Sequence, residues 1–212
     1  MRNFCITVAY DGSRYHGWQR IGNGQSIQGK IEAVLSEMTG HKVEIHGAGR
    51  TDAGVHARAQ VAHFKIKTDR TPDDIRAYLN RYLPEDIAVT ACETVDDRFH
   101  ARLNATGKRY VYRIWNSDTP NVFERKYLCR MEQKLDTVEM QRAADLLIGT
   151  HDFKAFCGNK KMKKSTVPTL HTARVERLGD EVRLTFEGTG FLQNMVRILA
   201  GTLVEVGQGK RN

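Results

Sequence analysis

The chain has 212 residues and a net charge of +8, because 33 Lys and Arg outnumber 25 Asp and Glu. That length suffices for one substantial core or for two small fused cores. The positive charge favours an anionic partner such as nucleic acid, although a charge that serves only solubility is an equal alternative. No run of about 18 apolar residues occurs, which excludes a predicted membrane span.

The first half alternates short strands with helices. Ser26 is a suitable N-cap for a helix with apolar residues at helical spacing, and Gly40 supplies its C-terminal stop. Thr71 and Pro72 have the residue types that open a second helix. The expected elements are strands at 3–10, 43–46, 59–66 and 87–95 and helices that begin after residues 26 and 71.

The second half repeats this theme with a strand at 108–115 and a helix that Asp136 opens. A hairpin follows, with strands 173–178 and 182–186 around a Gly-Asp turn, and residues 191–206 form a final amphipathic helix. We therefore expect an α+β fold with two α/β halves, residues 1–104 and 105–212, that share one sheet.

Four cysteines lie far apart and form no C-x-x-C pair, so neither a zinc ribbon nor a disulfide framework is indicated. Cys5 and Cys92 lie inside strand-like runs, where we expect buried thiols in a reducing compartment. The N-terminus reads directly into a strand without an apolar signal region. These features predict a cytoplasmic protein.

The most informative stretch is residues 49–57, GRTDAGVHA, which connects two predicted strands. Asp52 is its one acidic residue, Gly49 and Gly54 allow a close backbone approach to a ligand, and Arg50 can hold charge near the carboxylate. Taken by itself, an Arg-Thr-Asp-Ala-Gly stretch is more often a simple turn between strands with a solvated arginine.

The full string resembles the active-site signature of the TruA-type tRNA pseudouridine synthases. Three further blocks resemble that family in the same order along the chain: YDGSRYHGWQ at 10–19, then FHAR at 99–102 with ATGKRYVY at 105–112, and FLQNMVR at 191–197. The resemblance implies a pseudouridine synthase fold, with a central mixed, mostly antiparallel sheet, helices on one face and a cleft on the other. It also implies a homodimer.

The implied reaction isomerises uridine to pseudouridine at positions 38, 39 and 40 in the anticodon stem-loop of tRNA, after the nucleotide is flipped out of the stack. Nothing is oxidised and no group is imported, so no metal and no other cofactor is expected. By its match to the motif Asp52 is the nucleophile, and Arg197 is the arginine that pairs with it. Tyr110 is the tyrosine that stacks on the uracil, with Tyr112 as the fallback, and Arg50 holds the vacated space or phosphate.

Contacts with tRNA are expected from shape and phosphate recognition. The densest basic run lies in a predicted loop, although such a run is often only a solvated loop. The candidate contacts are Lys160, Lys161, Lys163, Lys164, Arg14, His16, Lys108 and Arg109. His56 is left out of the catalytic set, because a lone loop histidine is more often structural.

Two other functions remain open from the residues alone. A metal-dependent hydrolase could use His46, Asp52, His56 and His63, although no paired metal-ligand spacing supports it, and loss of activity in a chelator would favour it. A non-catalytic RNA-binding module would explain the charge but not an aspartate inside the signature. An Asp52→Asn protein that binds tRNA without making pseudouridine would exclude the second alternative.

The chain departs from the family at its C-terminus, since family members continue with another helix and a closing strand beyond the position of residue 212. We therefore expect the half at 105–212 to be truncated at its C-terminus. The alternative is that the chain is a catalytically impaired, RNA-binding relative of the family. Pro168 stands where many relatives have an arginine, which removes one expected RNA contact.

Overall fold

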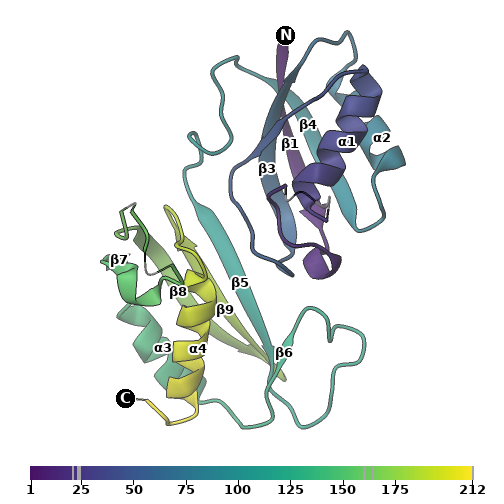
Figure 1. Cartoon of the computed structure of the whole chain (residues 1–212). Helices are drawn as coiled ribbons and strands as arrows, with labels where there is room; N and C mark the ends of the chain where they lie inside the picture. The colour runs from purple at the N-terminus through teal and green to yellow at the C-terminus, as the bar shows by residue number, and fades with distance from the viewer. Residues whose placement is uncertain (21, 23–24, 160, 164, 212) are drawn as a thin grey trace. The chain divides into compact units, whose positions relative to one another are not determined.

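The computed structural model describes residues 1–20, 22, 25–159, 161–163 and 165–211. The chain forms two compact units, Met1–Ala105 and Thr106–Asn212, each with its own sheet and helices (Figure 1). Lys160 and Lys164, two of the candidate RNA contacts, lie outside the described residues.

The first unit contains one antiparallel sheet in the strand order β2-β3-β1-β4, with α1 and α2 on the same side of it (Figure 1). Phe4, Ile6 and Val8 alternate along β1 and are almost fully buried beneath the helices. The elements are β1 Arg2–Tyr10, the 3-10 turn η1 Gly12–Arg14, α1 Ile27–Thr39, β2 Ile45–Gly47, β3 Ala57–Ile66, α2 Pro72–Tyr82 and β4 Ile87–Val95.

Local capping sets the ends of these helices as the sequence predicts. Ser26 Oγ accepts a hydrogen bond from the Gly29 amide at 3.2 Å, and Gly40 takes a left-handed backbone with φ of 72° after the last turn of α1. Thr71 and Asp74 form a reciprocal capping box at the start of α2.

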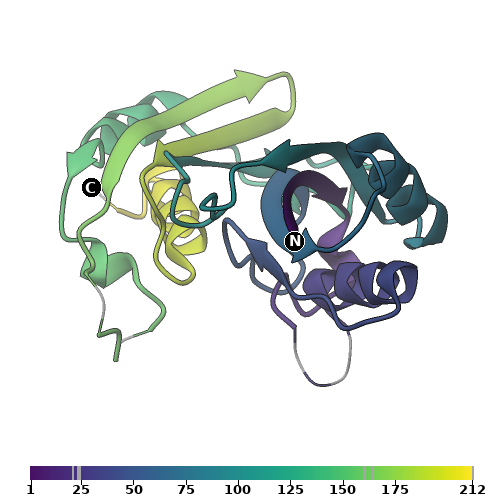
Figure 2. The same ribbon diagram turned by 90° about the horizontal axis from the view of Figure 1, so that it is seen from above.

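The second unit has a five-stranded sheet in the order β6-β5-β9-β8-β7, antiparallel except for the short β5–β6 pair. Figure 2 shows β8 and β9 as a long hairpin, which turns at Gly179 with φ of 61°. The elements are β5 Lys108–Trp115, β6 Cys129–Arg130, α3 Thr137–Asp145, β7 Gly149–Thr150, the 3-10 turn η2 Phe153–Phe156, β8 Thr169–Leu178, β9 Glu181–Gly188 and α4 Met195–Gly207.

The α+β class with largely antiparallel pairing is confirmed, whereas the described strands pair in two sheets rather than in the one shared sheet that we expected. Each unit has its own pair of helices and its own buried apolar cluster, so each sheet packs against helices of the same unit.

The predicted start of the last helix at residue 191 was wrong. The Met195 amide bonds to the Leu192 carbonyl at 3.1 Å, which makes a tight turn, and Asn194 has a left-handed φ of 58°. A helix cannot run through such a residue, so α4 begins at Met195.

Cys5 is buried and Cys92 is partly buried, and all four cysteines are free thiols. Burial, with a smaller contribution from nearby Glu93, raises the pKa of Cys5 to about 11. Burial likewise raises the pKa of Cys92 to about 12, so both thiols stay protonated at neutral pH. Among the described helices, none is long and apolar enough to cross a membrane.

Candidate active site

The stretch at 49–57 links β2 to β3, and hydrogen bonds to its backbone hold it from its first residue onward. The Ala48 amide donates to the Val61 carbonyl at 2.8 Å, and the Gln60 side chain donates to the Gly49 carbonyl at 2.9 Å. The Val55 amide closes a turn on the Asp52 carbonyl at 3.2 Å, and Gly54 takes a left-handed φ of 76°. This turn, which we call the Asp52 loop (residues 49–56), presents Asp52 partly buried at its bend.

The YDGSRYHGWQ block supports the Asp52 loop from the other side. The Trp18 amide donates to the Thr51 carbonyl at 3.1 Å, and the Gly54 amide donates to the Tyr15 carbonyl at 3.3 Å. Tyr10 Oη and Thr51 Oγ1 lie 2.8 Å apart in a further hydrogen bond. Residues on both sides of Asp52 are therefore held by backbone groups of one neighbouring segment.

Two glycines allow this contact. A Cβ at Gly12 would lie 2.0 Å from the Val55 carbonyl oxygen, and a Cβ at Gly17 would lie 2.3 Å from the Thr51 carbonyl oxygen. Gly17 also has a φ of 98°, which side-chain-bearing residues rarely adopt. From the sequence this block was expected only to offer RNA contacts at Arg14 and His16, whereas its two glycines before Trp18 were the signal for a close backbone approach.

His56 has a supporting role in the same contact. Its Nδ1 accepts a hydrogen bond from the Gly12 amide at 3.1 Å and lies 3.0 Å from Asp11 Oδ1. These contacts join His56 at the end of the Asp52 loop to the start of the supporting block.

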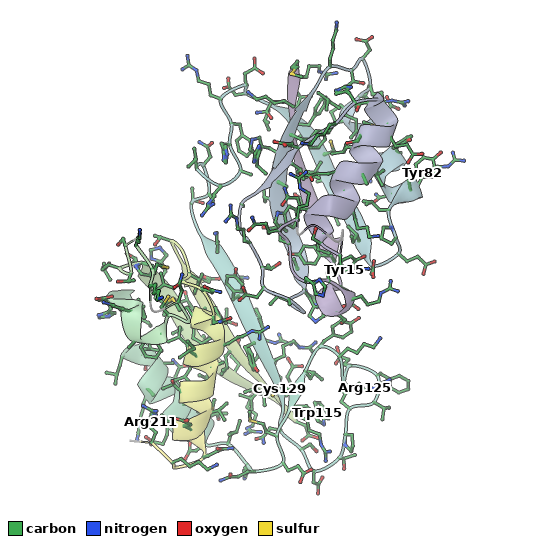
Figure 3. The ribbon with its side chains drawn as sticks, viewed as in Figure 1. Tyr15, Tyr82, Trp115, Arg125, Cys129 and Arg211 are labelled. Atoms are coloured by element: carbon green, nitrogen blue, oxygen red, sulfur yellow. The ribbon has the colours of Figure 1, made fainter. Side chains whose placement is uncertain are left out.

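Tyr15 anchors the supporting block to the first unit (Figure 3). It is 5% exposed, and its hydroxyl donates to Asp86 Oδ1 at 2.6 Å. Arg14 bonds to the other Asp86 oxygen at 2.5 Å. Burial raises the pKa of Asp86, but the hydrogen bonds from Tyr15 and Arg14 outweigh it and leave that pKa below its ordinary value.

In the second unit, aromatic residues of β5 meet the start of α4. Tyr110 packs edge-on against Phe191, with ring centroids 4.9 Å apart. Tyr112 lies against the core, near Cys129 of β6, which Figure 3 labels at the foot of the sheet. Burial, together with Cys129, raises the pKa of Tyr112, whereas the charge of exposed Arg197 lowers it. Arg197 therefore lies within electrostatic range of Tyr112.

The structure thus places Arg50 and Asp52 in one loop of the first unit, and Tyr110, Tyr112 and Arg197 together in the second unit. The predicted pairing of Asp52 with Arg197 connects residues of different units and stays a prediction.

Two of the candidate RNA contacts are exposed and already hold ion pairs. Arg14 bonds to Asp86, and Arg109 bonds to Glu187 on the neighbouring strand β9. Lys161 and Lys163 are exposed, as is His16, whereas Lys108 is partly buried.

The histidines of the metal-hydrolase alternative do not converge on an ion site. Among the residues that the structure describes, no group of three His, Cys, Asp or Glu side chains is arranged to hold a metal. His46 and His63 stack on each other with centroids 5.2 Å apart, while His56 binds Gly12 and Asp11.

Comparison with known proteins identifies the family of the chain. The family model described as tRNA pseudouridine synthase matches residues 6–104 and 143–212. A tRNA pseudouridine synthase A of Bacillus sp. (strain KSM-64) is 50% identical over all of this chain and 87% of its own length. A tRNA pseudouridine synthase A 2 of Bacillus cereus (strain ATCC 10987 / NRS 248) is 48% identical to the chain, and a tRNA pseudouridine synthase A of Acetivibrio thermocellus is 46% identical. Each match covers 99% of this chain and 86% of the relative.

An α+β chain with a supported aspartate loop and a basic surface fits a nucleic-acid-modifying enzyme. More particularly, the chain belongs to the tRNA pseudouridine synthase family.

Proposed function

We propose that this chain converts uridine to pseudouridine in tRNA, with the carboxylate of Asp52 as the nucleophile. One observation carries the proposal: the loop presents Asp52 at its bend, and Trp18 and Tyr15 bond to its neighbours on both sides. A group held by two fixed contacts is suited to a reaction that needs accurate positioning. Related synthases that match at 46 to 50% identity across nearly the whole chain support the assignment.

The reaction conserves all atoms of the nucleoside. The bond from C1′ to N1 breaks, the uracil turns, and C1′ bonds to C5. The C5 proton is then lost, and N1 gains a proton. Asp52 either adds to C1′ or assists loss of the base through a glycal, and both routes need an ionised carboxylate.

Three other residues complete the proposed site. Arg197 pairs with Asp52, since a guanidinium beside a carboxylate compensates a charge that is costly to remove from water alone. Tyr110 stacks on the uracil, and a ring face holds a base while leaving it free to turn in its plane. Exposed Arg50 occupies the space that the flipped nucleotide leaves.

The proposed substrate is the 3′ side of the tRNA anticodon arm, at positions 38 to 40, and the proposed assembly is a homodimer. Both follow from the family resemblance. Sedimentation of the free protein tests the assembly, and a monomer at working concentration would contradict it.

The test of function is pseudouridine mapping of an intact tRNA treated with wild type, Asp52→Asn and Asp73→Asn. Asp73 is a matched control, because it is an exposed carboxylate on α2 that forms an ion pair with Arg76. We expect modification with wild type and Asp73→Asn and none with Asp52→Asn, while all three bind tRNA. Wild-type levels with Asp52→Asn would refute the role of Asp52, and no product with wild type would refute the function.

The alternative of a catalytically impaired RNA-binding relative is not favoured, because the named synthases match this chain over 99 to 100% of its length. The same mapping experiment decides between the two.

A further inference from the structure

The FHAR block has no part in the proposed chemistry, yet it is firmly attached to the first unit. It lies in the segment 96–104, which follows β4 and packs against the sheet face opposite α1 and α2. The Asn3 side chain donates to the carbonyls of Asp96 at 2.8 Å and Phe99 at 3.0 Å, and Lys65 Nζ donates to the Asp97 carbonyl at 2.6 Å. Asn3 and Lys65 alternate with Phe4 and Phe64, which face the helices.

His63 lies beneath this segment and contacts it through its imidazole ring. It is 4% exposed, and its Nδ1 accepts a hydrogen bond from the Ala101 amide at 3.1 Å. The same ring stacks on the His46 ring of β2, with ring centroids 5.2 Å apart. Since Nδ1 is an acceptor, the proton must lie on Nε2. The neutral Nε2–H tautomer therefore bridges the FHAR block and β2.

Strand β2, whose His46 ring stacks on the His63 ring, leads directly into the Asp52 loop. His46 pairs with His63 in the β2–β3 ladder, and β2 ends one residue later at Gly47. Gly47 packs against the Trp18 indole, since a Cβ there would lie 2.6 Å from it. Only residues 47–51 separate His46 from Asp52.

We propose that His63 is a positioning residue, whose neutral imidazole ties the FHAR block to β2 and thereby fixes where the Asp52 loop leaves the sheet. This inference explains why a histidine stands at a buried sheet position, where an apolar residue would pack at lower cost. For catalysis it rests on the proposed function.

The surroundings keep the ring neutral, as the bridge requires. Burial, with the nearby His100 and His46 rings at 4.5 and 5.2 Å, lowers the pKa of His63 to about 4. The His63 ring is one wall of a cavity of about 380 Å³. The other titratable or charged residues that line this cavity are Glu44, His46, Lys65, Asp97, Arg98 and His100.

The first test is nitrogen NMR of the wild-type chain, which reports the tautomer directly. We expect His63 to be neutral at pH 7 with its proton on Nε2. A proton on Nδ1 would overturn the bridge, and this measurement does not depend on any variant folding.

The second test compares His63→Phe, which removes the hydrogen bond from the Ala101 amide, with His63→Asn, whose amide oxygen reproduces the acceptor at Nδ1. The free energy lost with one buried hydrogen bond corresponds to about a tenfold change in an equilibrium constant. The Ala101 amide should therefore exchange about tenfold faster in His63→Phe and at close to the wild-type rate in His63→Asn. The amide resonances of residues 48–54 should shift in His63→Phe and return toward wild type in His63→Asn. Unmoved loop resonances in His63→Phe would overturn the positioning role.

The third test is single-turnover pseudouridine formation. We expect about a tenfold lower rate in His63→Phe with tRNA affinity retained, and recovery in His63→Asn. His171→Phe, at an exposed position of β8, is the matched control and should behave as wild type. Equal losses in both His63 variants would contradict the role of the Ala101 bond. A wild type without product would refute the proposed function, while the loop resonances would still decide the positioning role.

Discussion

Replacing Gly17 with alanine should displace the Asp52 loop, and the size of the shift follows from the structure. The new Cβ would lie 2.3 Å from the Thr51 carbonyl oxygen, whereas ordinary contact begins at 3.4 Å. The loop or its support must therefore move by about 1 Å, directly beside Asp52. A misplacement of this size costs about 100-fold in rate when a catalytic group must be accurately oriented.

The same substitution also strains the backbone, because Gly17 has a φ of 98°. Gly40→Ala is the matched control, since Gly40 has a φ of 72° at the end of α1 but no atom within 4 Å of its built Cβ. Both variants should lose about 1–2 kcal/mol of unfolding free energy. Only Gly17→Ala should lose the pseudouridine-forming step.

The assay is single-turnover conversion of tRNA at saturating enzyme, with thermal unfolding measured on the same samples. Gly12→Ala offers an independent check, because its Cβ would lie 2.0 Å from the Val55 carbonyl oxygen and its φ is not positive. A wild-type rate in Gly17→Ala, or an equal loss of rate in Gly40→Ala, would show that the contact with the YDGSRYHGWQ block does not position Asp52.

Three further outcomes are expected. The pKa of His63 is lowered to about 4 from an ordinary value near 6.5. Between these two pH values the unfolded chain therefore binds more protons than the folded chain. The free energy of unfolding should therefore fall as the pH drops from about 6.5 to about 4, by about 3 kcal/mol in all, and identical pH slopes for wild type and His63→Asn would contradict this. Ser26→Ala removes the N-cap of α1 and should lower the unfolding free energy by about 1 kcal/mol in denaturant titrations, and an unchanged midpoint would disprove the capping role. If exposed Lys161 and Lys163 bind tRNA phosphates, replacing both with glutamine should reduce the slope of log affinity against log salt by about one per lysine, and an unchanged slope would remove them from the interface.

Much of the local structure followed from the sequence, because the interactions that set it join neighbouring residues. Ser26 and Gly40 bound α1, and Thr71 with Pro72 opens α2, since caps and turns involve groups only a few positions apart. The β5 strand was predicted at its observed ends by alternation alone. The place of Asp52 in a connection between strands was likewise evident, as the signature itself contains the turn.

The rest depended on which strands pair and in what register. The contact of Gly12 with Val55 and the bond from Ala101 to His63 join residues about 40 positions apart, and no local pattern encodes them. Sheet pairing also decided that the strands form two sheets, and the left-handed Asn194 decided that α4 starts four residues later than its apolar stripe suggested. Residue types alone determined the acidic loop, both ends of α1 and the start of α2. Only the folded backbone could bring the supporting block against that loop, because close packing depends on distances that the order of residues does not contain.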